Sequence, residues 1–194
     1  MNRFARWAAV ALTTLGLSAC LVPEKFETAV RFRPDGSYTY QYDGTAVHYL
    51  AAAALKETGR LDPKDEDGLR MDAEKGAKAP GVQKMRYTGQ GRYEIRIEEE
   101  VKAGKPVKSL PIFQLTRDKQ GAFLLTVPPL KEKDRQDLRS YGIRIDGKVE
   151  VYLPANAKVL EHNASSTPGL LSKSYGWKIG AVDDRPTIRF TLAP

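Results

Sequence analysis

The sequence predicts an α+β fold in which a strongly curved antiparallel β-sheet, partly open and barrel-like, packs on one or two helices. Three observations lead to this fold class. Roughly ten short segments alternate apolar with polar residues, which is typical of antiparallel strands with one face in water. Only a few segments carry apolar residues at helical spacing. A sheet with that many strands tends to curl or close, so a helix is expected on its concave side.

The first predicted elements form a hairpin. Residues 27–33 and 37–42 alternate on either side of a Pro-Asp-Gly turn at 34–36, a sequence that favours chain reversal. The second strand places three aromatic side chains on one face: Tyr38, Tyr40 and Tyr42.

The clearest helix is expected at residues 45–58. Thr45 is its expected N-cap, and Gly59 ends the helical spacing. Because this helix is rich in alanine, it suits the concave side of the sheet. Residues 60–80 are charged and contain several Gly and Pro residues, which indicates a long excursion with one short helix.

The rest of the chain reads mainly as strands. They are expected at residues 82–88, 92–101, 112–117, 122–127, 143–145, 148–153, 157–162, 175–179 and 187–192. A charged helix is expected at 131–141, with Leu138 as its main apolar contact. The dipeptide Asp146-Gly147 predicts a tight hairpin between its flanking strands, because a two-residue turn needs positive φ values.

The first residues have the layout of a secretory signal. Residues 1–6 carry two arginines and no acid, residues 7–17 are uncharged and mostly apolar, and small residues follow. The apolar run is about half of the ~20 residues that a membrane-spanning helix requires. We therefore expect a cleaved leader rather than a membrane span.

The end of this leader, Leu17-Ser18-Ala19-Cys20, resembles a bacterial lipobox. The resemblance implies cleavage between Ala19 and Cys20 and transfer of diacylglycerol to the Cys20 thiol. It divides the chain into a signal peptide at 1–19, a lipidated tether at 20–25 and a single β-rich envelope domain at 26–194. Because Leu21 is not the Asp that marks inner-membrane retention in such lipoproteins, the outer membrane, facing the periplasm, is favoured. The alternative is a plain secretory signal with an incidental cysteine.

Composition limits the classes of partner. Cys20 is the only cysteine, so neither an internal disulfide nor a thiolate zinc site is possible, and acylation would leave no thiol for redox chemistry. The formal net charge is +7, but the basic residues are scattered among acids without an aromatic RNA-binding signature. We expect a membrane as partner through the lipid, and no nucleic acid.

The search for catalytic and metal motifs finds no nucleophile elbow, zinc-protease, phosphate-loop or full dinucleotide motif. His48 and His162 each lack a neighbouring ligand at metal spacing, so structural roles are expected. The carboxylates of Asp183 and Asp184 are expected to be solvated loop charges. We expect no catalytic residue, no metal and no cofactor.

One segment partly matches a calcium loop. Its acidic and glycine positions are Asp65, Asp67, Gly68 and Glu74. The first ligand position, however, is Pro63, which has no side-chain oxygen, and Arg70 replaces an apolar residue. A flexible charged loop is the preferred interpretation.

A second resemblance concerns the later strands. The segments Lys148–Val151, Lys158–Ala164, Tyr175–Ile179 and Thr187–Leu192, together with the lipobox, resemble the LppM-type bacterial lipoproteins. The resemblance implies a β-rich ectodomain with a central apolar space for lipid or glycolipid, and no catalytic residue. The charged segment 60–80 departs from that pattern.

The candidate ligand-binding residues are aromatic: Tyr38, Tyr40, Tyr42 and Trp177. Their rings could pack on an acyl chain while their polar atoms reach a headgroup, or they could form ordinary core. Three functions remain: a lipid-anchored envelope protein that binds a lipid or other amphiphile, an interaction module for other envelope proteins, and an uncharacterised envelope enzyme. The first is the principal hypothesis, and an enzyme is the least favoured.

Overall fold

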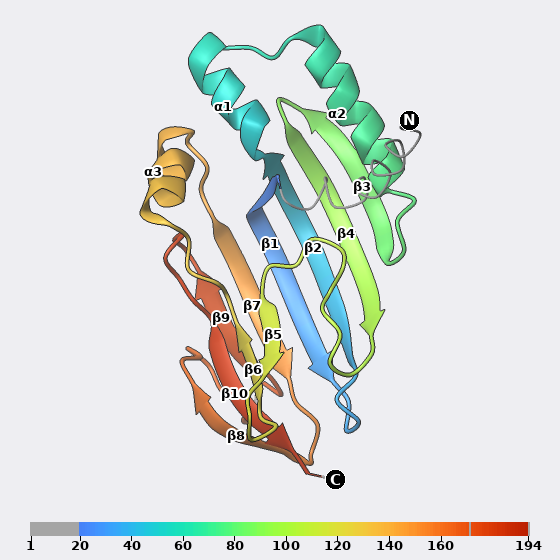
Figure 1. Ribbon diagram of the computed structural model, residues 1–194, viewed down its shortest axis with the longest axis vertical. Coiled ribbons are helices and arrows are strands. Elements are labelled where there is room, and N and C mark those ends of the chain that lie inside the picture. The colour runs from blue at the N-terminus through green and yellow to red at the C-terminus, as the bar shows by residue number, and fades with distance from the viewer. Residues whose placement is uncertain (1–19, 171, 194) are drawn as a thin grey trace, which may run out of the picture.

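Two β-sheets and three helices make up the protein in a computed structural model that describes residues 20–170 and 172–193 (Figure 1). The predicted leader at 1–19 lies outside the described residues. The α+β class is confirmed, but the single curved, barrel-like sheet is wrong, because the strands divide between a six-stranded and a four-stranded sheet and neither is closed or strongly curled. No helix in the described part of the chain is long and apolar enough to cross a membrane.

The larger sheet has the strand order β3-β4-β2-β1-β7-β9. Its strands are β1 (Leu21–Phe32), β2 (Tyr38–His48), β3 (Val82–Gly89), β4 (Arg92–Val101), β7 (Asp146–Tyr152) and β9 (Tyr175–Ile179). All neighbours pair antiparallel except β1 and β7, which run parallel. The sheet is therefore mixed.

The predicted hairpin at Asp146-Gly147 is wrong, because both residues belong to β7 and residues 143–145 form no strand. Gly147 pairs with Phe26 on one side and with Ile179 on the other. A Cβ on Gly147 would lie 2.4 Å from Cζ of Phe26. This glycine thus allows the Phe26 ring to lie against the strand, and no turn requires it.

The expected tether at 20–25 is also different in the structure. Strand β1 begins at Leu21, and residues 21–23 already pair with residues 46–48 of β2. The pairing is irregular between Pro23 and Phe26. That irregularity interrupts the alternation in the sequence, and it is the reason why the sequence alone places the start of the fold too late.

The smaller sheet is antiparallel with the order β5-β6-β10-β8. Its strands are β5 (Gln114–Arg117), β6 (Phe123–Thr126), β8 (Ala157–His162) and β10 (Thr187–Leu192). Its inner face packs on the far end of β1, where the ring centroids of Phe32 lie 4.9 Å from Phe190 and 6.1 Å from Phe123. The two sheets therefore share one aromatic core.

The helices lie toward the opposite end of the larger sheet from the C-terminus (Figure 1). They are α1 (Tyr49–Thr58), α2 (Pro63–Gly76) and α3 (Glu132–Ser140). Helix α1 is capped by His48 and not by Thr45, because β2 continues through His48. The prediction that α1 fills a concave sheet is wrong: α1 continues from the end of β2, and α2 packs on β3 through buried Leu69 and Ala73.

Most other sequence predictions of secondary structure are confirmed. The strands expected at 82–88, 92–101, 157–162, 175–179 and 187–192 agree with the observed elements within a residue. The two short strands β5 and β6 form the expected hairpin. Gly59 ends α1 with a φ of 74°, as a C-terminal glycine should.

Candidate functional site

Three of the four predicted ligand-binding residues are core residues of β2. Tyr38, Tyr40 and Tyr42 share one face, as expected, and each is at most 1% exposed. Their hydroxyls donate to the backbone carbonyls of Lys105, Leu110 and Thr45 at 2.8, 2.9 and 3.0 Å.

Burial raises the pKa of Tyr38 to about 12 and raises the pKa values of Tyr40 and Tyr42 further. The hydroxyls therefore stay protonated and act as structural donors.

Trp177 lies apart from the three tyrosines. It is on β9, its ring is buried, and its Nε1 donates to Oδ1 of Asn163 at 2.7 Å. Trp177 borders one surface hollow and Tyr38 borders another, whereas Tyr40 and Tyr42 border neither of these two. Neither of these two hollows is therefore bordered by all four predicted residues.

The hollow beside Trp177, called here the charged hollow, has a volume of about 590 Å³ and lies across β1, β7 and β9. Most of its lining side chains are charged or hydroxylated, among them Lys25, Glu27, Asp43, Lys148, Ser165, Ser166 and Lys178. Both signs of charge are present. A ligand in this hollow would have to match these charged groups, because burying them unpaired would remove their hydration.

The second hollow, called here the β5 groove, has a volume of about 440 Å³. It lies between the free edge of β5 and residues 102–113, called here the wall loop. Its lining is mostly apolar and consists of Tyr38, Pro106, Val107, Pro111, Phe113, Leu115 and Pro128 with the polar residues Gln114 and Thr116. An apolar groove with a few polar groups is the usual character of a small-molecule site.

The wall loop is held in place by hydrogen bonds from the larger sheet. The hydroxyls of Tyr38 and Tyr40 bind its carbonyls, and the carboxylate of Glu99 accepts from the backbone N–H of Lys108 at 3.2 Å and of Ser109 at 3.1 Å. The ring of Phe113 packs edge-on against Tyr40 with 5.5 Å between centroids. These contacts therefore fix the position of the wall loop.

The segments that supply the lining also carry basic residues. The wall loop carries the exposed side chains of Lys102, Lys105 and Lys108. On β5 itself, the guanidinium of Arg117 lies 4.1 Å from the ring centroid of Phe123. An apolar groove beside several lysines is suited to a molecule with one apolar chain and an anionic head.

Sequence reasoning identifies Tyr38 but misses the rest of this groove. The composition of residues 102–113 indicates only a loop of Gly, Lys and Pro. The signal that could mark them is the set of apolar residues Val107, Leu110 and Phe113, which are buried although the loop is rich in Lys and Pro. A loop that lies wholly in solvent would not need apolar side chains of this size.

Both histidines have structural roles. Burial lowers the pKa of His48, so its neutral Nδ1 accepts from the backbone N–H of Ala51 at 3.3 Å and caps α1. The Nδ1 of His162 accepts from the N–H of Ala164, and its ring packs against Tyr175.

The calcium-like segment is part of α2, so Asp65, Asp67, Gly68 and Glu74 cannot wrap around an ion. Nor do residues 20–170 and 172–193 bring together three or more His, Cys, Asp or Glu side chains suited to a metal ion.

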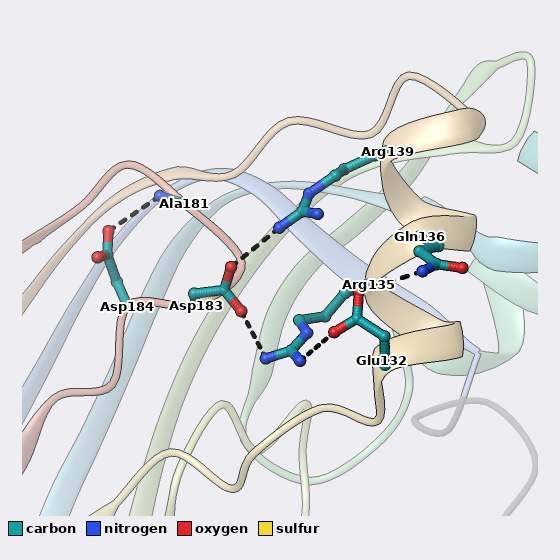
Figure 2. Close-up of polar contacts among 7 residues, drawn as sticks. All are labelled: Glu132, Arg135, Gln136, Arg139, Ala181, Asp183 and Asp184. Carbon is teal, nitrogen blue, oxygen red and sulfur yellow. Dashed lines mark hydrogen bonds and ion pairs between the residues drawn. The ribbon is translucent and has the colours of Figure 1, made fainter.

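The two loop carboxylates are exposed, as expected, and they also have polar partners, as Figure 2 shows. Asp183 binds Arg135 at 2.9 Å and Arg139 at 3.0 Å, both on α3. Asp184 accepts from the backbone N–H groups of Gly180 and Ala181 at 2.7 and 2.9 Å. Asp183 thus links the loop between β9 and β10 to α3, whereas Asp184 bonds within the loop itself.

Cys20, the predicted lipidation residue, is the first described residue. It is partly exposed, and its carbonyl accepts from the N–H of Tyr49 at 2.8 Å. The predicted cleavage position beside it involves Ala19, which lies outside the described residues.

No protein-family model and no curated protein matches this sequence. Among solved structures, the fold is similar to the NMR structure of the folded domain of the Mycobacterium tuberculosis protein LppM. The TM-score is 0.38 and the sequence identity 13%, over 86% of this chain and 87% of that chain. LppM gives its name to the type of protein that the sequence motifs resemble, and at this identity no site residue is transferred from it.

Proposed function

We propose that this chain is a lipid-anchored protein of the bacterial cell envelope whose domain binds an anionic amphiphile in the β5 groove and carries out no reaction. The observation that supports the ligand is the lining of the groove, which has seven apolar residues, and the wall loop that forms one side of it carries exposed lysines. The predicted lipobox supports the anchor. The outer membrane, facing the periplasm, is the proposed location, because Leu21 follows the cysteine.

The chemistry of the groove favours a single acyl chain. Its volume falls in the range of ~300–1,000 Å³ that is usual for small-ligand sites. Tyr38 lies beneath the rest of the lining: it is fully buried and its hydroxyl donates to the carbonyl of Lys105, so it supports the wall loop. Because hydrogen bonds already fix the wall loop, little conformational entropy is lost on binding.

Fluorescence of cis-parinaric acid, an anionic fatty acid, tests this proposal. The protein is the mature chain with Cys20→Ser, which carries no lipid of its own. We expect saturable binding that is weaker for the uncharged methyl ester, because the ester removes the attraction to the lysines.

A matched pair of variants locates the site. Gln114→Trp places a bulky ring at the groove, since Gln114 is exposed and lines it. Gln83→Trp makes the same change at an exposed position of the edge strand β3, away from the groove. Binding should be lost in the first variant and kept in the second. Equal binding by both variants, or no binding by the parent protein, would contradict the proposal.

A second candidate function, docking to another envelope protein, is favoured by the free edge of the smaller sheet. Its edge strand β8 presents Leu160, which is 43% exposed, and Leu170 in the following loop is fully exposed. A photo-crosslinker at position 160 in living cells should give one discrete adduct that a crosslinker at Gln83 does not give. No adduct at either position would exclude docking at this edge.

A further inference from the structure

The folded domain begins directly after Cys20, the residue proposed to carry the lipid anchor. Leu21, the next residue, already pairs with His48 in the larger sheet. The carbonyl of Cys20 itself is bound by the N–H of Tyr49, the first residue of α1. Acyl chains on the Cys20 sulfur must therefore leave the domain beside the first turn of α1.

The surface at this turn suits a membrane boundary. Leu50, the second residue of α1, is 60% exposed. Next to it, Tyr49 and Tyr141 are half-buried and pack edge to face with 5.4 Å between centroids. Tyrosine has an apolar ring with a polar tip and is enriched where proteins meet the membrane–water boundary. A single exposed leucine is ordinary elsewhere, but here it lies where acyl chains would enter the bilayer.

The β5 groove lies at the other end of the same strand. Tyr38, which lines the groove, begins β2, and His48, which pairs beside the anchor, ends it. Ten residue steps along an extended strand cover about 30 Å. Figure 1 shows the same arrangement, with α1 at one end of β2 and β5 toward the other.

We infer that the acylated protein rests on the bilayer through the first turn of α1, and that the β5 groove lies at the end of the domain away from the membrane that holds the anchor. The inference depends on the proposed acylation of Cys20. It commits to the bilayer as the occupant of the α1 surface, because the anchored residue is continuous with that surface. The groove would then exchange its ligand with the aqueous space or with a facing membrane, and not with the bilayer beneath.

Spin labelling of the acylated protein tests this orientation. The mature lipidated chain is reconstituted in vesicles made of equal parts of phosphatidylethanolamine and phosphatidylglycerol. Single labels are placed at Leu50→Cys and Leu160→Cys, which are both exposed leucines, on α1 and β8 respectively. The collision rates of each label with oxygen, which enters the bilayer, and with a water-soluble nickel chelate are then measured.

We expect the label at position 50 to collide several-fold less with the chelate, relative to oxygen, than the label at position 160. A label at Ala53→Cys, one turn further along α1, provides a second test if the first variant folds poorly. Equal exposure to the chelate at positions 50 and 160 in protein that floats with the vesicles would overturn the orientation while leaving the anchor intact. Protein that lacks acyl chains and does not float would overturn the anchor and the orientation together.

Discussion

Replacement of Gly147 by alanine tests the parallel pairing of β1 with β7. The added Cβ would lie 2.4 Å from Cζ of Phe26, well inside van der Waals contact. The Phe26 ring has little room to retreat, because it is buried and stacks on Tyr42 with 5.7 Å between centroids. Overpacking of a filled core typically costs ~1–3 kcal/mol, and Gly147→Ala should lower the free energy of unfolding by that amount.

Urea denaturation followed by circular dichroism measures this loss. Because Phe26→Leu removes the ring, the double variant should be destabilised less than the sum of the two single variants. Gly68→Ala is the control: Gly68 lies within α2, and a Cβ added there would have no heavy atom within 4 Å, so alanine should raise stability by about 0.5–1 kcal/mol. An unchanged midpoint for Gly147→Ala, or losses that simply add, would refute the contact.

Three further predictions follow from single contacts. Tyr40→Phe leaves a buried carbonyl of the wall loop without its donor, so urea denaturation should show a loss of about 1–2 kcal/mol and parinaric acid should bind more weakly. Asp183→Ala removes the exposed ion pairs to α3; its melting temperature should fall slightly at low salt, and the difference from the parent should shrink in ~1 M salt because the charges are screened. Hydrogen bonds from Lys84 and Arg86 lower the pKa of Glu94 to about 2, so its contribution to stability is present above the ordinary glutamate pKa and is lost as the pH falls toward 2. Glu94→Gln should therefore lose less stability than the parent between about pH 5 and pH 2 in acid titrations of the unfolding midpoint.

Local patterns in the sequence predict most of the strands but not how they pair. The alternation in β4, β8, β9 and β10 is visible because each has neighbouring residues on opposite faces of a sheet. The parallel contact of β1 with β7 joins residues more than a hundred positions apart, and no local period encodes it. The Asp146-Gly147 pair has the composition of a turn. In the structure, glycine is needed at position 147 because the Phe26 ring leaves no room for a side chain there.

The candidate site is only partly predictable for a related reason. The shared face of Tyr38, Tyr40 and Tyr42 follows from the period of a strand. What covers that face depends on the wall loop, whose carbonyls occupy the hydroxyls of Tyr38 and Tyr40. The wall loop follows β4 and packs on β2. Its proline-rich composition does not indicate which strand it packs on.

The helices illustrate competition between local signals and pairing. Thr45 has the side chain of a good N-cap, but it remains in β2 because its neighbours pair with β4 up to Val47. His48 then takes the capping position. In residues 60–80, Asp62 is the N-cap of α2 and Pro63 is its first residue, so the start of this helix is encoded locally. The many charged residues and glycines of the segment make the rest of the helix hard to recognise from the sequence.

Intact-mass spectrometry of the protein extracted from bacterial membranes tests the central claim, the lipid anchor, most directly. We predict a chain that begins at Cys20 and carries the added mass of diacylglycerol, and we predict that a Cys20→Ser variant lacks this species. A chain cleaved at another residue, or one with the mass of the bare polypeptide, would contradict the claim.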